Sequence, residues 1–344
     1  MEKFKKILKI LGVIFGLLAL LVVVFHLIPR EHAVEDNAFL TGKGNRPAII
    51  AHGGGNAEFP DNTLEAYYHA YSIDKNVIFE TDVNITKDGV IILCHDDTLD
   101  LTSNKTGYVS DWSYTDLLEQ EVNFAYYNDV IDGKRVSDVL IQYRTFDNRT
   151  VTPQDVVYPQ GITPRHETKF LVTTLEELIT AFPSNKILVD IKQLGEIGIN
   201  ALKIVLELMA RLDGQYNTYE RIVIGTFNPE VFEELKEQKA LDPRLQYSPY
   251  YDGVFKFYIT HWFGLDFIFD EPVSVMSIPD YHEGLPFKLR HLINAAHRHN
   301  IAVHYWTIND EKTMRELAKK GADGIITDRP TLLKQVLDEM FDNP

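Results

Sequence analysis

The chain has 344 residues, of which 45% are hydrophobic, and it carries a formal net charge of −16. This apolar content is enough for a large core, and the length allows one large domain or two small ones. So acidic a chain is a poor candidate for nucleic-acid binding, which needs a basic surface. Its single cysteine, Cys94, excludes an intrachain disulfide.

The N-terminal segment is predicted to be a membrane anchor. Residues 10–29 are largely apolar, and the helix expected from Ile10 would run about 28 Å, close to the hydrocarbon thickness of a bilayer. The lysines within residues 1–9 form a basic tail that is expected to stay cytoplasmic. A secretory signal peptide is the alternative, but the apolar run is long for one and no small-x-small cleavage motif follows it. We therefore predict a single-pass protein of the cell membrane, in which polar residues 30–46 tether an extracytoplasmic domain.

The remaining chain, residues 47–344, alternates short apolar runs with helical patterns, which is typical of a parallel sheet covered by helices. Asn62 or Thr63 is predicted to cap the first helix, and Cys94 to be buried at the end of a strand. The predicted strands cover residues 48–51, 77–83, 90–94, 186–191, 221–226, 245–247, 273–278, 301–307 and 324–327. The predicted helices cover residues 64–70, 199–212, 229–239, 288–299, 310–320 and 331–341.

Two stretches do not fit this alternation. Residues 105–170 have no sustained period and collect Tyr, Asn, Asp and Arg. Residues 250–271 are rich in Phe, Tyr and Trp. For the second stretch we predict a packed loop, and the alternative is an apolar wall for a lipid or glycolipid substrate.

An acidic pair lies on the predicted strand 77–83. Glu80 and Asp82 are two residues apart, so their carboxylates project from the same face. The alternate positions are mostly apolar and would face the helices, which argues against a simple solvated pair. His52 and His95 end the apolar runs on either side. Each feature alone has a structural explanation, but two imidazoles flanking two carboxylates are typical of metal-assisted acid–base chemistry.

Several strings, in a fixed order, resemble the glycerophosphodiester phosphodiesterase family. They are HGGG from His52, PDNTLEAY from Pro60, FETDVNITKDG from Phe79, CHDDTL from Cys94, WTIND from Trp306 and GADGIITDRP from Gly321. The resemblance covers residues 48 to about 337 and implies a TIM (β/α)8 barrel with its site at the C-terminal ends of the strands. It also implies that residues 105–170 are an insertion after the second barrel strand, lying over the barrel mouth.

The resemblance implies a role for particular residues. His52 and His95 match the family's acid and base. A divalent cation, Mg²⁺ or Ca²⁺, would be held by Glu80, Asp82 and Asp190, the last standing where the family usually has Glu. Substrate and phosphate would contact Lys192 and Trp306. The chain departs from the family at Gly53 and Leu101, where arginines are common, and these losses leave the identity of the substrate open.

The expected reaction is hydrolysis of a phosphodiester to an alcohol and glycerol phosphate. The expected substrates are glycerophosphodiesters, lysophospholipids or glycerol-phosphate polymers, and the nucleophile is either water or a neighbouring substrate hydroxyl. One alternative is a catalytically weak relative that binds a phosphodiester or cell-wall polymer, although binding alone needs no paired acid and base. Another is a glycosidase with two carboxylates, which leaves both histidines and Lys192 without a role.

Overall fold

The computed structural model of the protein describes residues 2–30, 32, 34–42 and 44–342. Residues 1, 31, 33, 43 and 343–344, which belong to the predicted tail, tether and barrel, lie outside the described residues.

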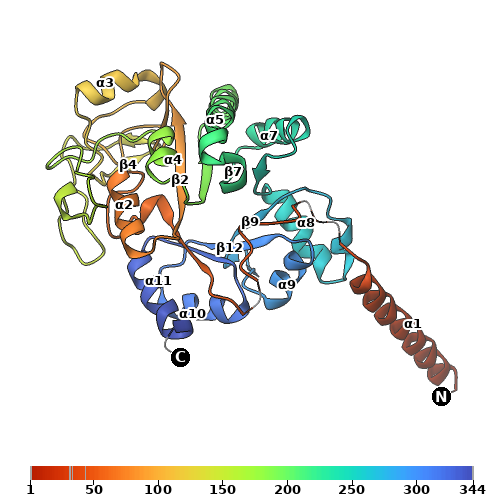
Figure 1. Ribbon diagram of the computed structural model, residues 1–344. Coiled ribbons are helices and arrows are strands. Elements are labelled where there is room, and N and C mark those ends of the chain that lie inside the picture. Colours follow the sequence, from red (N-terminus) through yellow and green to blue (C-terminus); the bar gives the residue numbers. More distant parts are fainter. Residues whose placement is uncertain (1, 31, 33, 43, 343–344) are drawn as a thin grey trace.

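Eight parallel strands form a nearly closed barrel, which confirms the predicted TIM-barrel fold (Figure 1). Successive barrel strands in chain order are paired, and the last strand, β13, pairs with the first, β1; among the described residues the exception is β8 and β9, which form the two ends of the ladder. The strands, in order around the sheet, are β8 (Gln246–Tyr247), β7 (Ile222–Thr226), β6 (Ile187–Ile191), β2 (Ile78–Ile85), β1 (Ala48–Ala51), β13 (Gly324–Thr327), β12 (Ala302–Trp306) and β9 (Val275–Pro279). The predicted strand 90–94 is β3 (Ile91–Leu93), which pairs antiparallel with β2 outside this ring.

The helices cover the outside of the barrel. They are α2 (Leu64–Ile73), α4 (Leu175–Ala181), α5 (Gly195–Tyr216), α6 (Thr218–Arg221), α7 (Pro229–Leu241), α8 (Tyr251–His261), α9 (Arg290–Arg298), α10 (Glu311–Lys320) and α11 (Pro330–Leu337), followed by a π-helical turn, η5 (Asp338–Asp342). Of the two predicted caps of α2, Thr63 is the one used, because its side chain accepts a hydrogen bond from the backbone N–H of Ala66. The side chain of Asn62 does not cap α2 and is available for other hydrogen bonds.

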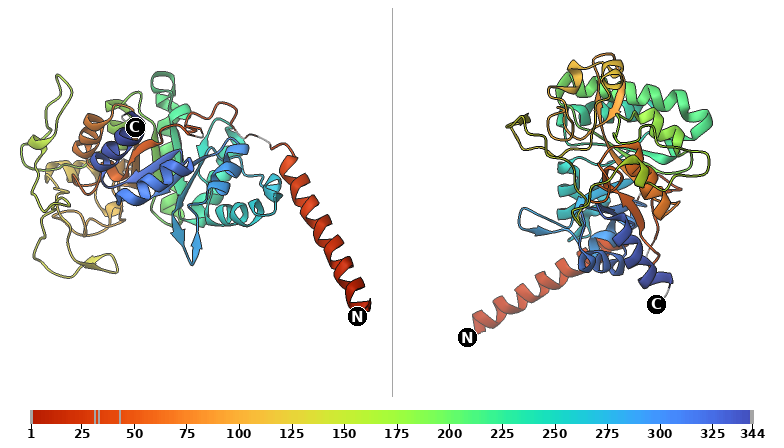
Figure 2. Two further views of the ribbon diagram at one scale, coloured as in Figure 1. Left: turned by 90° about the horizontal axis from the view of Figure 1, so that it is seen from below. Right: turned by 90° about the vertical axis from the view of Figure 1, so that its left-hand side faces the viewer.

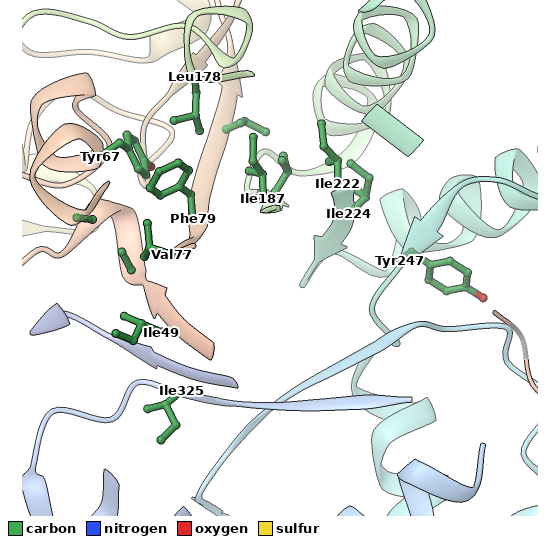
Figure 3. Packing of buried hydrophobic residues seen from close by; sticks show 14 of the residues in the cluster. Ile49, Tyr67, Val77, Phe79, Leu178, Ile187, Ile222, Ile224, Tyr247 and Ile325 are labelled. Carbon is green, nitrogen blue, oxygen red and sulfur yellow. The ribbon is translucent and has the colours of Figure 1, made fainter. Parts of the chain in front are cut away.

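Two apolar cores follow from the alternation of side chains along each strand. Outward-facing residues meet the helices: Tyr67 of α2 packs edge-on against Phe79 of β2, with ring centroids 5.2 Å apart (Figure 3). Inward-facing residues fill the barrel interior around Phe39. On β2 the inward residues are Ile78, then Glu80 and Asp82, so the interior turns from apolar to acidic along the strand. The predicted common face of the two acids is therefore the barrel interior.

The segment before the barrel is a long exposed helix followed by a packed strap. Helix α1 (Glu2–Leu27) has no buried residue and is long and apolar enough to cross a membrane, a test that an N-terminal secretion signal also meets. It includes the basic tail as well as the predicted anchor. The following segment crosses the N-terminal end of the barrel: Phe39 is buried there, and the Asn37 amide donates to the carbonyls of Ser274 and Asn300. The predicted tether is thus fixed to the barrel floor for part of its length.

The segment predicted to be an insertion, residues 105–170, consists mainly of loops with a few short elements. It contains η2 (Val109–Asp111), α3 (Tyr114–Glu119), β4 (Val130–Ile131), β5 (Lys134–Arg135) and η3 (Pro153–Asp155). It packs beside the loop after β1, where the Tyr143 hydroxyl donates to the Asn56 carbonyl over 2.5 Å and the Phe146 N–H donates to the Ala57 carbonyl. These contacts place part of residues 105–170 at the C-terminal end of β1, and the position of the insertion over the barrel mouth stays a prediction.

The prediction of a packed loop for the aromatic stretch 250–271 is wrong, because most of this stretch is helical. It forms α8 and the short helix η4 (Leu265–Ile268). Aromatic residues are only moderate helix formers, so the local sequence gives a weak helical signal. Tertiary packing decides the outcome: Phe257 is fully buried, with its ring centroid 5.0 Å from that of Phe269 and 5.5 Å from that of His299.

Candidate active site

A cavity of about 410 Å³ opens at the C-terminal ends of the barrel strands. It gathers the predicted site residues from distant parts of the chain; those that line it are His52, Glu80, His95, Asp190, Lys192 and Trp306. Asp82 lies buried beside Lys192. The other end of the cavity is mainly aromatic and aliphatic, with lining residues Phe227, Tyr250, Tyr251, Val254 and Phe287. The site therefore has a charged end and an apolar end.

His52 follows β1 directly and is held by two elements. Its Nδ1 lies 2.6 Å from Asp328 Oδ1, just beyond β13, which is the neighbour of β1. Its Nε2 lies 4.0 Å from Glu80 Oε2. Burial opposes the charged imidazolium, but the charge of Glu80 and the hydrogen bond with Asp328 outweigh it and raise the pKa of His52 to about 10. The ring is fixed so that Nε2 is the nitrogen nearer the acidic end of the cavity.

Asp328 is itself held by Asn309. The Asn309 amide donates to Asp328 Oδ2 over 2.6 Å, and its carbonyl oxygen accepts from the backbone N–H of Asp328 over 2.9 Å. His52, Asp328 and Asn309 thus form one hydrogen-bonded chain that sets the orientation of the imidazole.

The acidic end is built on the paired strands β2 and β6, where Asp82 and Asp190 are register partners. Between them lies Lys192, whose Nζ is 2.9 Å from Asp82 Oδ1 and 2.7 Å from Asp190 Oδ2. Burial alone would lower the pKa of Lys192, but the charges of Asp190 and Asp82 hold it well above its usual range. The ammonium is therefore charged and fixed at the floor of the site.

The carboxylates of Glu80, Asp82 and Asp190 lie close together, and their pKa values are shifted from the usual range. Burial, followed by the charge of Asp82, raises the pKa of Glu80 to about 7. Burial also raises the pKa of Asp190, whereas Lys192 and the histidines outweigh burial at Asp82 and lower its pKa. Like charges in a buried site resist common ionisation. The site would gain from a further positive charge.

His95 lines the same cavity and lies on the loop after β3. Its Nδ1 is 2.8 Å from Asp96 Oδ1, and this hydrogen bond raises the pKa of His95. The loop is shaped by Asn84 of β2, whose amide donates to the carbonyls of Cys94 and Asp96. Cys94 is buried, as predicted. Each of the two histidines therefore has one nitrogen held by a carboxylate.

Asn62 and Asp61 are site residues that the sequence reasoning missed. The Asn62 amide donates to Asp82 Oδ2 over 3.0 Å, and its carbonyl oxygen accepts from the Asp82 backbone N–H over 3.1 Å. Asp61 is half-buried, and desolvation followed by the charge of Asp82 raises its pKa. The sequence pattern indicates only a possible helix cap for Asn62.

Asp328 and Asn309 were also missed, although their position was available. Asp328 directly follows a barrel strand, as His52 does. A polar residue at the C-terminal end of a barrel strand is a candidate site residue, and this criterion, which identified His52, applies equally to Asp328. Asn309 follows β12 and required the fold to connect it with Asp328.

Gly53 has a structural reason to lack the family's arginine. Its φ of +53° is in the left-handed region, and a Cβ there would lie 2.8 Å from the Cβ of Asp61. The Gly53 N–H donates to Glu80 Oε2 over 2.9 Å, which fixes that carboxylate. In the part of the chain that the structure describes, Lys192 is the only lysine or arginine lining the cavity.

The acids fit a divalent cation chemically. In the described residues, no three carboxylate, imidazole or thiolate groups are already arranged together as metal ligands, since Lys192 lies between Asp82 and Asp190. However, Asp190 Oδ1 is buried without a hydrogen-bond partner among the described residues, and Asp82 Oδ1 has only the ion pair with Lys192. Buried oxygens of this kind are the ligands that Mg²⁺ and Ca²⁺ prefer.

Comparisons with known proteins agree with this geometry. The model of the glycerophosphoryl diester phosphodiesterase family matches residues 52–332. The chain is 25% identical to a glycerophosphodiester phosphodiesterase of Caldanaerobacter subterraneus, covering 83% of this chain and 95% of the relative. It is also 25% identical to human lysophospholipase D GDPD1, covering 84% and 85%.

Solved structures share the fold. A phosphodiesterase of Oleispira antarctica, in complex with the product sn-glycerol-3-phosphate, has a TM-score of 0.56 and 18% identity, covering 85% of this chain and 97% of that one. A glycerophosphoryl diester phosphodiesterase of Silicibacter pomeroyi has a TM-score of 0.59 and 20% identity, covering 87% and 96%.

Proposed function

The chain belongs to the glycerophosphoryl diester phosphodiesterase family and is a phosphoric diester hydrolase. We propose that it is a membrane-anchored, metal-dependent member of this family, in which His52 and His95 act as acid and base. The observation that supports this most directly is that both imidazoles line one cavity with the acids and Lys192. Each imidazole has Nδ1 held by a carboxylate, so its Nε2 is the nitrogen available to exchange a proton with a substrate.

The reaction breaks the P–O bond to an alcohol and forms a P–O bond to the nucleophile, which is water or a neighbouring substrate hydroxyl. One histidine takes the proton of the nucleophile and the other donates a proton to the leaving alcohol oxygen. The Lys192 ammonium attracts the phosphate and offsets the negative charge that grows in the transition state. A divalent cation held by Glu80, Asp82 and Asp190 would withdraw further charge from the phosphate oxygens.

The substrate class follows from the two ends of the cavity. A phosphodiester at the charged end would place its alcohol against the aromatic and aliphatic side chains at the other end. This arrangement supports glycerophosphodiesters and lysophospholipids, and two relatives carry these activities in their names. Glycerol-phosphate polymers are the remaining candidates. The exposed apolar helix α1 supports attachment to the membrane, and its lysines favour a catalytic domain outside the cytoplasm.

A substrate panel tests the proposal. The full chain, stripped of metal and then given Mg²⁺ or Ca²⁺, is offered glycerophosphoethanolamine, a lysophosphatidylcholine or a polyglycerol phosphate, and the released alcohol is measured. We expect release only with a cation present. Full activity in excess chelator would refute the metal requirement, and binding of the panel without turnover would favour the non-catalytic alternative.

Histidine variants test the acid–base assignment in the same assay. His52→Ala and His95→Ala should each lower kcat by about 10²- to 10⁴-fold, the usual contribution of a positioned acid or base. The matched control is His32→Ala, because His32 is exposed and lies in the tether. Near-normal rates in both site variants contradict the assignment.

A further inference from the structure

The outer face of α8 carries large apolar side chains that are exposed. Helical geometry continues to Trp262, and Phe255, Ile259, Trp262 and Phe263 recur at the spacing of one helical face. Each of them exposes between 43% and 55% of its surface. The opposite face is also apolar and is packed against the barrel, with Phe257 fully buried. A helix that is apolar on both faces is expected to be covered on both, so the outer face is an interaction surface.

This outer face adjoins the end of the helix that is able to span a membrane. The turn that follows Phe263 contacts α1: the His26 ring lies against Gly264, and the Phe25 and Phe267 ring centroids are 5.8 Å apart. Phe25 is two residues from the end of α1, which corresponds to about 3 Å along the helix axis. If α1 spans a bilayer, the membrane surface therefore lies level with this turn.

A buried ion pair joins Arg30, three residues after the end of α1, to η4. Arg30 donates from Nε and Nη2 to the two carboxylate oxygens of Asp266 in η4, over 2.8 and 3.0 Å, and both side chains are almost completely buried. Arg298 adds a second guanidinium to the same carboxylate over 3.0 Å. Breaking such a buried pair is costly, because it leaves an unpaired charge inside the protein. The direction in which α1 leaves the domain is thus set by the structure and not by a free linker.

We propose that the outer face of α8, formed by Phe255, Ile259, Trp262 and Phe263, docks on the lipid surface of the bilayer in which α1 is anchored. This inference rests on the membrane anchoring proposed above. A bilayer is the occupant that the anchor brings to this place, and Trp and Phe side chains are well suited to the headgroup layer.

Docking would also set the orientation of the active site. The inner side of the same helix contributes Tyr251 and Val254 to the cavity lining. Both views of Figure 2 show α1 and the blue hairpin of β10 (Tyr281–His282) and β11 (Leu285–Pro286) projecting to the same side of the barrel. His282 of this hairpin also lines the cavity, so the hairpin stands at the edge of the site. A lipid phosphodiester could then enter from the membrane past α8.

Quenching of a fluorescent label by lipid tests the docking directly. The chain has one cysteine, which is buried, so Cys94→Ala gives a background for labelling single cysteines in the full chain reconstituted in phosphatidylcholine nanodiscs. An environment-sensitive label is placed by Phe263→Cys, and the nanodiscs contain lipids with a spin-label quencher at the headgroup. Val24→Cys near the end of α1 is the positive control. Leu118→Cys on α3, at the far side of the barrel in Figure 1, is the negative control.

We expect the label at Phe263 to be quenched about as strongly as that at Val24, with Leu118 unaffected. Ile259→Cys repeats the measurement on the same face if Phe263→Cys does not fold. Quenching at Val24 without quenching at either α8 position overturns the docking and leaves the anchor in place. Absence of quenching at Val24 overturns anchor and docking together, whereas the phosphodiesterase assignment is judged separately by the substrate panel. A blue-shifted α8 label that lipid does not quench identifies a protein contact and also overturns the proposal.

Discussion

Replacing Asp328 by Asn should slow catalysis by removing the charge that orients His52. The side chains are nearly isosteric, but the 2.6 Å contact with His52 Nδ1 loses its charge-assisted character. Hydrogen bonds to charged groups contribute about 1.5–3 kcal/mol. If that energy is fully used in the transition state, kcat should fall by about 10- to 150-fold. The assay is release of alcohol from a soluble glycerophosphodiester at saturating substrate and cation.

The same variant should move the pH profile in a defined direction. The charge of Glu80 and the hydrogen bond with Asp328 together raise the pKa of His52 to about 10. Removing the charge of Asp328 therefore lowers this pKa, whether His52 serves as acid or as base. The limb of the kcat profile that reports His52 should shift to lower pH by about one to two units.

The control for Asp328→Asn is Glu311→Gln, which removes an exposed carboxylate from α10. Its kcat and pH profile should match those of the unaltered chain. A folded Asp328→Asn variant with unchanged kcat and an unchanged pH profile would refute the claim that Asp328 positions His52. A change confined to KM would instead indicate a role in substrate binding.

Three further outcomes are expected. Asp190→Ala should weaken metal affinity by about 10-fold or more in a titration of activity against Mg²⁺ and Ca²⁺, while Asp190→Glu keeps activity or shifts the metal preference; an unchanged requirement in Asp190→Ala would remove this residue from the site. Burial lowers the pKa of His304 from 6.5 to about 4, so the unfolded chain binds the extra proton and up to about 3 kcal/mol of stability is lost as pH falls through this window. His304→Leu should flatten the dependence of Tm on pH between those values, and an unaltered slope contradicts the assignment. Protease added to intact cells should digest the domain after Arg30 while α1 stays in the membrane fraction, and a protected domain contradicts the topology.

The sequence was most informative where one local rule fixes a side chain's direction. Alternation along β2 determines that Glu80 and Asp82 share a face, and parallel strands place their C-terminal ends at one edge of the sheet. His52 and Asp190 could therefore be expected near the two acids before the fold was known. Strand boundaries shifted by one or two residues without altering these faces.

The sequence was least informative where non-local packing decides the structure. The helical state of α8 depends on Phe257 packing against Phe269 and His299, which no local pattern shows. The path of the tether depends on Phe39 entering the barrel floor. The link from His52 through Asp328 to Asn309 joins three separate loops, and it becomes visible only when β1, β12 and β13 are adjacent.

The barrel interior also explains how a fold can carry so many buried acids. At the N-terminal end, Phe39 and inward residues such as Ile50 and Ile78 form a closed apolar floor. The acids begin one inward position further along β2, at Glu80, where the interior opens into the cavity. Lys192 and hydrogen-bond donors offset the repulsion between these acids. Because the acids lie beyond the apolar floor, they take little part in the packing that closes the barrel. Burial and the charge of Asp82 still raise the pKa of Glu80 despite these partners, so the negative charge at the mouth is only partly neutralised. A phosphodiester substrate would add a further negative charge to this site. That excess of negative charge is the strongest physical reason for expecting a divalent cation to bind there with the substrate.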